Sequence, residues 1–318
     1  MTLKKIAEMA NVSVSTASRA LNNSYGISEA TRKQVVSAAE ACGYFAEKKR
    51  VKIENRRKDC PSFAIICPEI ISSYYSRMAV FLIDFLRENG CDSTLYNTAF
   101  SEENHRKLFK KCLDDPDTDA IISFGTLDLK MGKESIPIAF FGKSRDNSSV
   151  VHEMTFGIER AVGHLVSKGR KHIAFVGEQL TLSKQEVFLR ICEDFPLAKT
   201  DCFCTIQRFD RAGTAAARYF LNRSEMPDGI ICAYDEIAYG LISSLKENGV
   251  RVPQDVSVIG INDIPSAPYF FGGLSTVKFE HEEVIKKLVR DMIDDYKNGT
   301  AQKREYSVES TLVLRNTD

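Results

Sequence analysis

From residue 63 onward, short apolar runs alternate with amphipathic segments, and this alternation restricts the fold more than any other feature of the sequence. Short apolar runs bounded by polar residues favour buried strands, whereas apolar residues at three- and four-residue spacing favour helices that bury one face. A chain that alternates the two forms parallel sheets covered by helices, because each parallel crossover needs a connection of helix length. The expected fold class is therefore α/β.

The rhythm occurs twice, which predicts two lobes with parallel sheets. In the first set we expect strands at 63–67, 94–96, 120–124, 138–141 and 150–151, with helices at 75–88 and 102–113. In the second set we expect strands at 173–176, 203–206, 229–233 and 256–260, with helices at 157–167, 185–193, 212–221 and 236–248. Ligands of such folds gather at the carboxyl ends of the strands, so a small-molecule site between the lobes is expected.

The N-terminal segment has a different pattern, which predicts three short helices around one small all-α core. Ser13 can cap the second helix, and Asn11 can end the first in a left-handed conformation. The third helix fits residues 28–42, with Gly43 as its stop. The outer face of the second helix carries hydroxyls, an amide and a guanidinium but no acid, so phosphates can approach it. A DNA-binding unit and a purely structural bundle both remain open at this point.

The formal net charge of zero conceals a segregation of charge along the chain. Residues 1–58 carry 12 Lys or Arg against 5 Glu, whereas the remainder carries 31 basic against 38 acidic residues. A basic end on an acidic body favours binding of a polyanion such as DNA, although basic ends also serve solubility alone.

Several other classes of protein are disfavoured. No apolar stretch is long enough to span a membrane and the N-terminus does not resemble a secretory signal, so we expect a cytoplasmic protein without membrane contact. Nine cysteines without a C-x-x-C pair and five scattered histidines predict no metal site, and no cofactor is expected. The enzyme motifs G-x-G-x-x-G, G-x-S-x-G and H-E-x-x-H are absent, which disfavours catalysis. A transporter's sugar-binding protein would need a signal peptide and no N-terminal helical unit.

The stretch TLKKIAEMANVSVSTASRALN, residues 2–22, resembles the headpiece of the LacI/GalR family of bacterial regulators. Residues 233–263 and the Leu-Val-Leu-Arg of 312–315 are similar to the family's sensor domain. The resemblance implies a helix-turn-helix headpiece at 1–44, a basic hinge or linker at 45–60, and a periplasmic-binding-protein-like effector-binding and dimerisation domain at 61–318. Its lobes are expected at about 61–155 with 280–299 and at about 156–279 with 300–318.

The resemblance also implies roles for residues of the headpiece. Val14, Ser15 and Arg19 occupy positions that meet base edges, where Arg19 can donate two hydrogen bonds to guanine and Val14 can contact a thymine methyl. The positions that meet the DNA backbone are Thr2, Ser13, Thr16, Ser18 and Asn22. Family members act as homodimers, because a palindromic operator requires that symmetry. We therefore expect a homodimeric repressor of transcription that binds double-stranded operator DNA.

The linker departs from the family pattern. Relatives carry Pro-Asn followed by a hinge helix whose Leu wedges open a base step in the minor groove. Here Ala46 and Glu47 replace the Pro-Asn pair, and Ile53 falls where the wedge Leu would be, which makes it a weak wedge. A flexible charged tether is the alternative interpretation. Basic residues of this run are expected on the DNA backbone: Lys48, Lys49 and Arg50.

Six positions correspond to effector-binding positions of the family: Tyr74, Tyr75, Lys184, Phe209, Asp235 and Asn262. The ring of Phe209 suits the apolar face of a sugar or base. Asn262 replaces an Asp and Lys184 stands roughly where an Arg is common, which removes a charge and a bidentate donor. The expected effector is a sugar or related metabolite, and a regulator with a degenerate pocket that needs no effector is the alternative. Asp235 can instead cap a helix, and Tyr74 can pack in the core.

Overall fold

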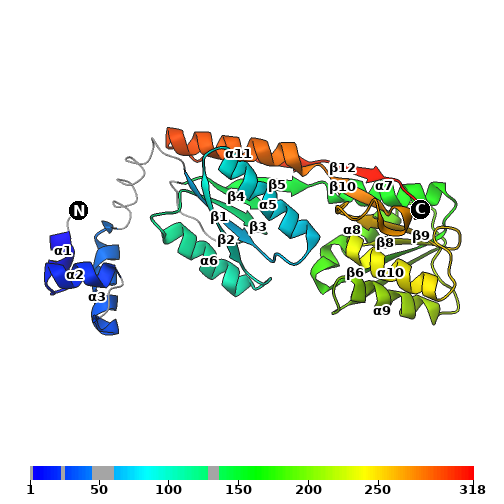
Figure 1. Cartoon of the computed structure of the whole chain (residues 1–318), viewed down its shortest axis with the longest axis horizontal. Helices are drawn as coiled ribbons and strands as arrows, with labels where there is room; N and C mark the ends of the chain where they lie inside the picture. Colours follow the sequence, from blue (N-terminus) through cyan, green and yellow to red (C-terminus); the bar gives the residue numbers. More distant parts are fainter. Residues whose placement is uncertain (1–2, 23–25, 45–60, 128–135) are drawn as a thin grey trace. The chain divides into compact units, whose positions relative to one another are not determined.

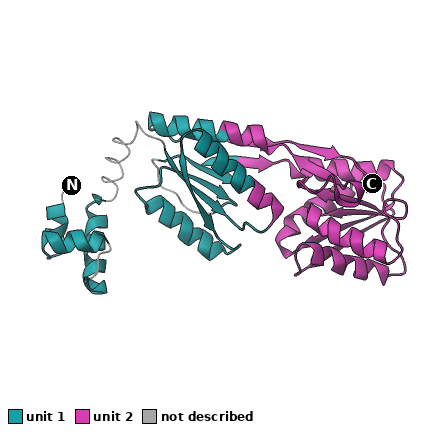
Figure 2. Ribbon diagram, in the orientation of Figure 1, with its two compact units in different colours: residues 1–71, 78–149, 288–304 teal, residues 72–77, 150–287, 305–318 magenta. Residues whose placement is uncertain are grey.

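The computed structural model describes residues 3–22, 26–44, 61–127 and 136–318 of the 318-residue chain. The chain divides into two compact units, shown in teal and magenta in Figure 2. Unit 1 comprises Met1–Ile71, Met78–Ser149 and Leu288–Arg304. Unit 2 comprises Ser72–Arg77, Val150–Lys287 and Glu305–Asp318. The chain therefore passes between the units at several points, and each unit is built from segments that are distant in sequence.

The N-terminal residues form the three predicted helices, α1 (Leu3–Met9), α2 (Val14–Leu21) and α3 (Glu29–Ala41). Asn11 has a φ of +46°, which confirms the left-handed stop after α1. The Ser13 hydroxyl accepts a hydrogen bond from the Thr16 N–H at 3.1 Å, and so caps α2. The helices share one small core made of the buried residues Ile6, Ala7, Ala10, Ala17, Ala20, Val35, Ala38 and Ala39.

The first sheet has six strands in the order β11-β5-β4-β3-β1-β2, and its four strands β1 to β4 run parallel (Figure 1). Its central strands β3 and β4 are completely buried, as expected for a sheet covered on both faces. The strands are β1 (Ser62–Cys67), β2 (Asp92–Asn97), β3 (Ala120–Phe124), β4 (Ile138–Phe141), β5 (Ser148–His152) and β11 (Glu305–Val308). The helices that alternate with them in sequence are α5 (Ser73–Glu88) and α6 (Glu102–Asp114).

The second sheet lies in unit 2 and has the order β12-β10-β9-β8-β6-β7. All its neighbouring strands run parallel except β12, which is antiparallel to β10. Its strands are β6 (His172–Glu178), β7 (Lys199–Thr205), β8 (Gly229–Cys232), β9 (Ser257–Ile261), β10 (Ser275–Phe279) and β12 (Ser310–Val313). Helix α7 packs against α8, and α9 packs against α10. These helices are α7 (Met154–Ser167), α8 (Leu182–Cys192), α9 (Asp210–Leu221) and α10 (Asp235–Glu247).

The α/β fold class is confirmed, but the last part of the chain holds elements that the apolar runs did not predict. They are η2 (Phe270–Gly272), a short 3-10 helix, then β10, the long helix α11 (His281–Asn298), β11 and β12. Another short 3-10 helix, η1 (Gln179–Thr181), lies between β6 and α8. The unit boundaries fall within α5, β5 and α11 and directly before β11. None of the described helices is long and apolar enough to cross a membrane.

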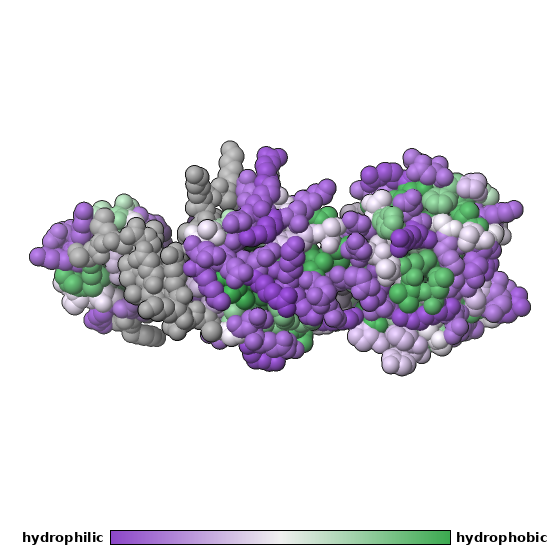
Figure 3. Space-filling model, turned by 90° about the horizontal axis from the view of Figure 1, so that it is seen from above, coloured by the Kyte–Doolittle hydropathy of each residue, from purple (hydrophilic) through white to green (hydrophobic). Residues whose placement is uncertain are grey.

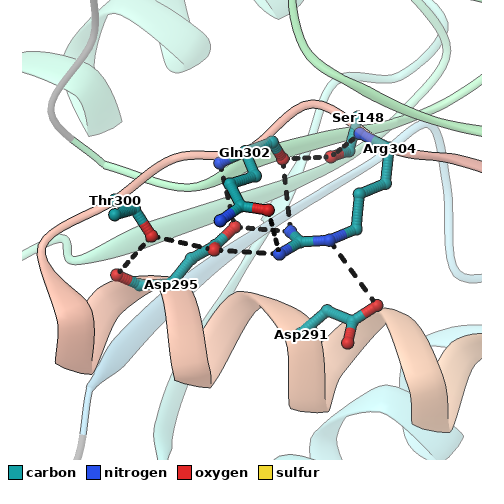
Figure 4. A network of polar contacts seen from close by, with 6 residues as sticks. All are labelled: Ser148, Asp291, Asp295, Thr300, Gln302 and Arg304. Carbon is teal, nitrogen blue, oxygen red and sulfur yellow. Dashed lines mark hydrogen bonds and ion pairs between the residues drawn. The ribbon is translucent and has the colours of Figure 1, made fainter.

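A polar network around the buried carboxylate of Asp295 in unit 1 holds the turn that follows α11 (Figure 4). The Arg304 guanidinium donates to both carboxylate oxygens of Asp295, at 2.6 and 3.0 Å. The Gln302 N–H and the Thr300 hydroxyl donate to the same carboxylate, each at 3.0 Å. Burial alone would raise the pKa of Asp295, but these hydrogen bonds outweigh it and lower that pKa. The network therefore fixes the path by which the chain leaves α11 and enters β11.

Candidate DNA-binding surface and effector site

Helix α2 presents one face to its own core and a different set of residues to solvent. Ala17 and Ala20 are buried, whereas Ser15 and Arg19 are exposed. Val14 is 44% exposed and lies on the same outer side of the helix. An exposed Val beside hydroxyls and a guanidinium suits the major groove, where a thymine methyl offers an apolar partner.

The hydroxyls around the start of α2 form a compact polar group. Ser13 Oγ lies 2.9 Å from Ser15 Oγ and 2.8 Å from Thr16 Oγ1. Ser18 is half-buried and Asn22 is an exposed C-cap residue whose N–H donates to the Ser18 carbonyl at 3.0 Å. Ser13 and Thr16 therefore lie at the start of α2, Ser18 lies in its middle, and Asn22 lies at its end. The other residues expected on DNA, Thr2, Lys48, Lys49, Arg50 and the wedge Ile53, lie outside the described residues.

In unit 2, several polar and aromatic residues lie at the carboxyl edge of the sheet. Glu178 ends β6, Phe209 follows β7, and Asn262 follows β9. Tyr234 and Asp235 follow β8, which lies between β6 and β9 in the sheet. The parallel order thus brings together residues that are far apart in sequence, at the edge where ligands of parallel sheets bind.

Two of the expected effector residues have backbone conformations that disfavour a side chain. Phe209 has φ +56° and ψ −139°, and Asn262 has a φ of +110°. Such conformations cost about 1–3 kcal/mol for residues other than Gly and occur preferentially at ligand sites. Asp263, directly after Asn262, also has a positive φ of +48°. The strain therefore concentrates at the same sheet edge.

Lys184 lies in the first turn of α8, and its Nζ donates to the Ala233 carbonyl at 2.7 Å. Burial lowers the pKa of Lys184 to about 8, against the opposing effect of the carboxylates of Asp235, Glu236 and Glu178. The ammonium is thus placed beside the end of β8.

Asp235 is fully buried and both of its carboxylate oxygens accept hydrogen bonds from the protein. The Thr276 hydroxyl donates to Oδ1 at 2.5 Å, and the Ile264 N–H donates to Oδ2 at 2.8 Å. Burial raises the pKa of Asp235 to about 8, although both hydrogen bonds act to lower it. The first turn of α10 has no side-chain cap, so Asp235 fastens the loop after β9 rather than capping its own helix.

A buried ion pair at this edge was missed by sequence reasoning. Glu178 is 2% exposed and accepts from Arg208 Nε at 3.1 Å and from the Tyr234 hydroxyl at 2.9 Å. The same hydroxyl accepts the Phe209 N–H at 3.0 Å, and the Arg208 guanidinium lies 4.6 Å from the Phe209 ring centre. This network holds Phe209 in its strained conformation. The sequence did contain a signal for this ion pair, because an acidic residue follows directly after the apolar run of β6.

Tyr74 and Tyr75 begin α5 and are half-buried, with ring centres 5.1 Å apart. The Tyr74 hydroxyl lies 3.0 Å from His152 Nε2 and 3.4 Å from His281 Nε2, so it has polar partners and does not simply pack in a core. The two imidazoles are themselves 2.8 Å apart, Nε2 to Nε2. Although the histidines are scattered in sequence, the fold therefore brings two of them into contact.

Large apolar side chains are exposed on loops at the same edge. Ile206, directly after β7, is 77% exposed, and Tyr269, in the loop between β9 and β10, is 83% exposed. The face seen in Figure 3 is mostly hydrophilic, with separate hydrophobic areas. Singly exposed side chains of this kind are common on protein surfaces, so they assign no binding role by themselves.

A three-helix unit with an exposed, acid-free helix face, together with parallel α/β units, defines a DNA-binding regulator with a periplasmic-binding-protein-like body. The family model "Bacterial regulatory proteins, lacI family" matches residues 2–47, and "Periplasmic binding protein-like domain" matches residues 162–317. The chain therefore carries a lacI-type DNA-binding domain and a periplasmic-binding-protein-like domain, and it is a DNA-binding transcription regulator.

Individual relatives match over nearly the whole chain. The HTH-type transcriptional repressor PurR of Proteus mirabilis (strain HI4320) is 24% identical, with 99% of this chain and 96% of the relative covered. Among solved structures, the lac repressor dimer bound to operator and the anti-inducer ONPF has a TM-score of 0.70 at 20% identity, covering 100% of this chain and 98% of that one. The complex of the transcriptional regulator CelR with cellobiose has a TM-score of 0.67 at 20% identity and covers 100% of both chains. At these identities the two structures establish the fold alone.

Proposed function

We propose that the chain is a repressor that binds a palindromic operator as a homodimer and is controlled by a small-molecule effector, a sugar or related metabolite. In this proposal residues 1–44 are the headpiece, 45–60 the hinge, and 61–318 the effector-binding and dimerisation domain. Effector binding changes the dimer so that the two headpieces no longer fit both half-sites. The observation that carries the proposal is the outer face of α2, where Val14, Ser15 and Arg19 are all exposed.

Val14, Ser15 and Arg19 are assigned to base edges. Replacing Arg19 by Ala should cost about 1–3 kcal/mol on the cognate operator and relax the preference for one base pair. Backbone contacts are assigned to Ser13, Thr16, Ser18 and Asn22, and also to Thr2, Lys48, Lys49 and Arg50. Loss of a backbone lysine should weaken all sequences alike and flatten the salt dependence of binding.

A matched pair of serines separates DNA contact from helix capping. Ser13 caps α2 and Ser28 caps α3, and each hydroxyl accepts the N–H of the third residue onward at 3.1 Å. Each change to Ala should therefore destabilise its helix by a similar amount, about 1 kcal/mol. Only Ser13 is assigned to DNA, so operator affinity, measured by fluorescence anisotropy, should fall further for Ser13→Ala. Equal losses for the two variants would remove Ser13 from the interface.

The effector site is assigned to the carboxyl edge of the unit 2 sheet. Tyr74, Tyr75, Phe209 and Asn262 are proposed to contact the ligand, with Lys184 as a donor beside them. Asp235 belongs to the site through the loop that it fastens, because its oxygens bond Thr276 and Ile264. The polar and aromatic composition fits a ligand with hydroxyls and an apolar face. The CelR structure, which holds cellobiose, is consistent with that choice.

The backbone at Asn262 determines how its role is tested. With φ at +110°, Ala would be strained, whereas Gly would relieve the strain and remove only the amide. Asn262→Gly should therefore fold at least as well as the native chain, bind operator normally, and lose its response to effector. Calorimetry against sugars, phosphosugars and nucleobases, with and without operator, identifies the ligand. If Asn262→Gly keeps the native response, Asn262 does not contact the effector.

The alternative is a regulator whose pocket has degenerated and which acts without an effector. The replacement of an expected Asp by Asn262 and of an expected Arg by Lys184 favours it. Silence of the native chain across the whole ligand panel, combined with normal operator binding, would support this second function over the first.

A further inference from the structure

We propose that Tyr74, His152 and His281 form a binding site for a divalent transition-metal ion of the cobalt-to-zinc series. Its donor set differs from that of the sugar-type effector site, although it shares Tyr74 with the residues proposed to contact the effector. All three residues belong to unit 2, and come from the start of α5, the end of β5 and the start of α11. Among the described residues no group of three or more His, Cys, Asp or Glu is placed to hold a metal ion. Two imidazoles and a phenol are a different donor set.

The three candidate ligand atoms form a triangle of the right size. Its sides are 2.8 Å between the two Nε2 atoms, and 3.0 and 3.4 Å from these to the Tyr74 oxygen. One ion can lie at about 2.0–2.1 Å, the usual zinc–nitrogen distance, from all three atoms at once. Regular tetrahedral coordination separates ligand atoms by roughly 3.3–3.4 Å, so the two imidazoles need to move apart by about 0.5 Å. The fourth position stays open.

The hydrogen bonding around the imidazoles is favourable for a metal ion. Their Nε2 atoms face each other at 2.8 Å. The His281 ring also hydrogen-bonds the backbone carbonyl of Phe279, which leaves Nε2 as its lone-pair nitrogen. Metal-binding histidines usually donate their other N–H to such a carbonyl. The arrangement around His281 is therefore that of a preformed metal ligand.

The surroundings are apolar on one side and mixed in charge on the other. The Phe279 ring lies 5.3 Å from His152 and 5.8 Å from His281, centre to centre. Two cations lie near the site: Arg77, which is paired with Glu282 at 3.7 Å, and Lys184, whose charge acts on His152. All three ligand residues are half-buried, which leaves a path for a hydrated ion.

Binding requires two proton movements. The two imidazoles share one Nε2 proton, which must move to Nδ1 of His152, and the phenol of Tyr74 must release its proton to solvent as the metal–oxygen bond forms. Affinity should therefore rise with pH, with about one proton released per ion. The ion would cross-link α5, β5 and α11 within unit 2, each a few residues from a point where the chain passes to unit 1.

The test uses the full-length chain without a histidine tag, stripped with a chelator and titrated with Co²⁺ by absorption spectroscopy and with Zn²⁺ by calorimetry. One ion per chain is expected, without the sulfur-to-cobalt charge-transfer band that cysteine ligands give. His152→Gln and His281→Gln should each weaken binding by more than the roughly 10–100-fold that loss of a second-shell partner causes. His105→Gln is the matched control, because this buried histidine bonds Ser123 at 2.7 Å in unit 1.

Tyr74→Phe keeps the ring and removes only the ligand oxygen, so it tests the site even if the histidine variants fold poorly. It should bind more weakly and lose the proton release. The proposal is overturned if the native chain binds no stoichiometric ion, if a sulfur charge-transfer band accompanies binding, or if Tyr74→Phe and both folded histidine variants bind as the native chain does.

Discussion

Helices α9 and α10 touch backbone to backbone, and replacing Gly240 by Ala should force them apart. A Cβ at Gly240 would lie 1.9 Å from the Asp210 carbonyl oxygen and 2.6 Å from its carbonyl carbon. Real Cβ atoms essentially never approach within 3.0 Å, so a displacement of about 1 Å is needed, and only rigid helix backbone can supply it. Overpacking of this kind costs about 1–3 kcal/mol, at the upper end when backbone must move. Alanine returns about 0.5–1 kcal/mol of helix propensity, which leaves a net loss of about 1–2 kcal/mol.

Gly163 in α7 provides the matched control, because a Cβ there would meet the Phe195 ring at an ordinary 3.4 Å. Gly163→Ala should therefore stabilise the chain by about 0.5 kcal/mol or leave it unchanged, through propensity alone. Urea unfolding followed by circular dichroism measures both changes. The Gly240 variant should also bind effector more weakly, since Phe209 precedes α9 and Tyr234 precedes α10. A Gly240→Ala variant as stable as Gly163→Ala would refute the close contact.

Three further predictions concern buried carboxylates, each measured by urea unfolding. Asp235 has a folded pKa of about 8 against an ordinary 3.8, so the unfolded chain binds fewer protons between these pH values. The stability of the native chain should therefore fall as pH rises from 4 to 8. Asp235→Asn should flatten that slope, and an unchanged slope would contradict the assignment. Asp295 has a lowered pKa, so its contribution is present above pH 3.8 and is lost as pH falls through the folded value. Asp295→Asn should cost about 1.5–3 kcal/mol at pH 7, with a gap that closes in acid. Glu178→Gln keeps an acceptor for Tyr234 but removes the charge partner of Arg208; it should cost about 1–3 kcal/mol, and no loss would mean the pair is not formed.

The parts of the fold that sequence predicts best are those where local and tertiary preferences agree. The run at 120–124 is apolar except for Ser123 and becomes β3, which is buried on both faces. The capping serines Ser13 and Ser101 fix where α2 and α6 begin, and each accepts the N–H of the third residue onward. In these segments the local sequence alone predicts the element and where it begins, and the structure agrees with it.

The elements after residue 260 were not predicted, for two different reasons. Strands β11 and β12 have four residues each, and much of their sequence is polar, so no apolar run marks them. Helix α11 does have a helical repeat, with Ile285, Leu288 and Met292 buried. Its periodicity would have predicted the helix, although not its continuation across a unit boundary.

Contacts at the candidate sites depend on tertiary structure and leave little trace in sequence. Glu178 and Arg208 are 30 positions apart and meet only because β6 and β7 are neighbours. His152 and His281 are separated by 129 positions, and nothing in the spacing indicates their contact. The residue types therefore predicted that polar side chains would gather at the carboxyl edge of the sheet. Which of these side chains contact each other could be known only from the order of the strands.

The strained backbone at Phe209 and Asn262 supports a ligand-binding role for these side chains independently of the family resemblance. Gly would adopt both conformations without cost, so the chain forgoes about 1–3 kcal/mol at each position by keeping a side chain there. The Phe209 conformation is held by the Tyr234 hydroxyl, which is itself bonded to Glu178, and Asn262 is held by its N–H bond to the Val277 carbonyl at 2.8 Å. The surrounding structure thus maintains two unfavourable conformations at one edge of one sheet. These two conformations do not stabilise the fold. They do hold an aromatic face and an amide in fixed positions, which is what a ligand that binds to both requires.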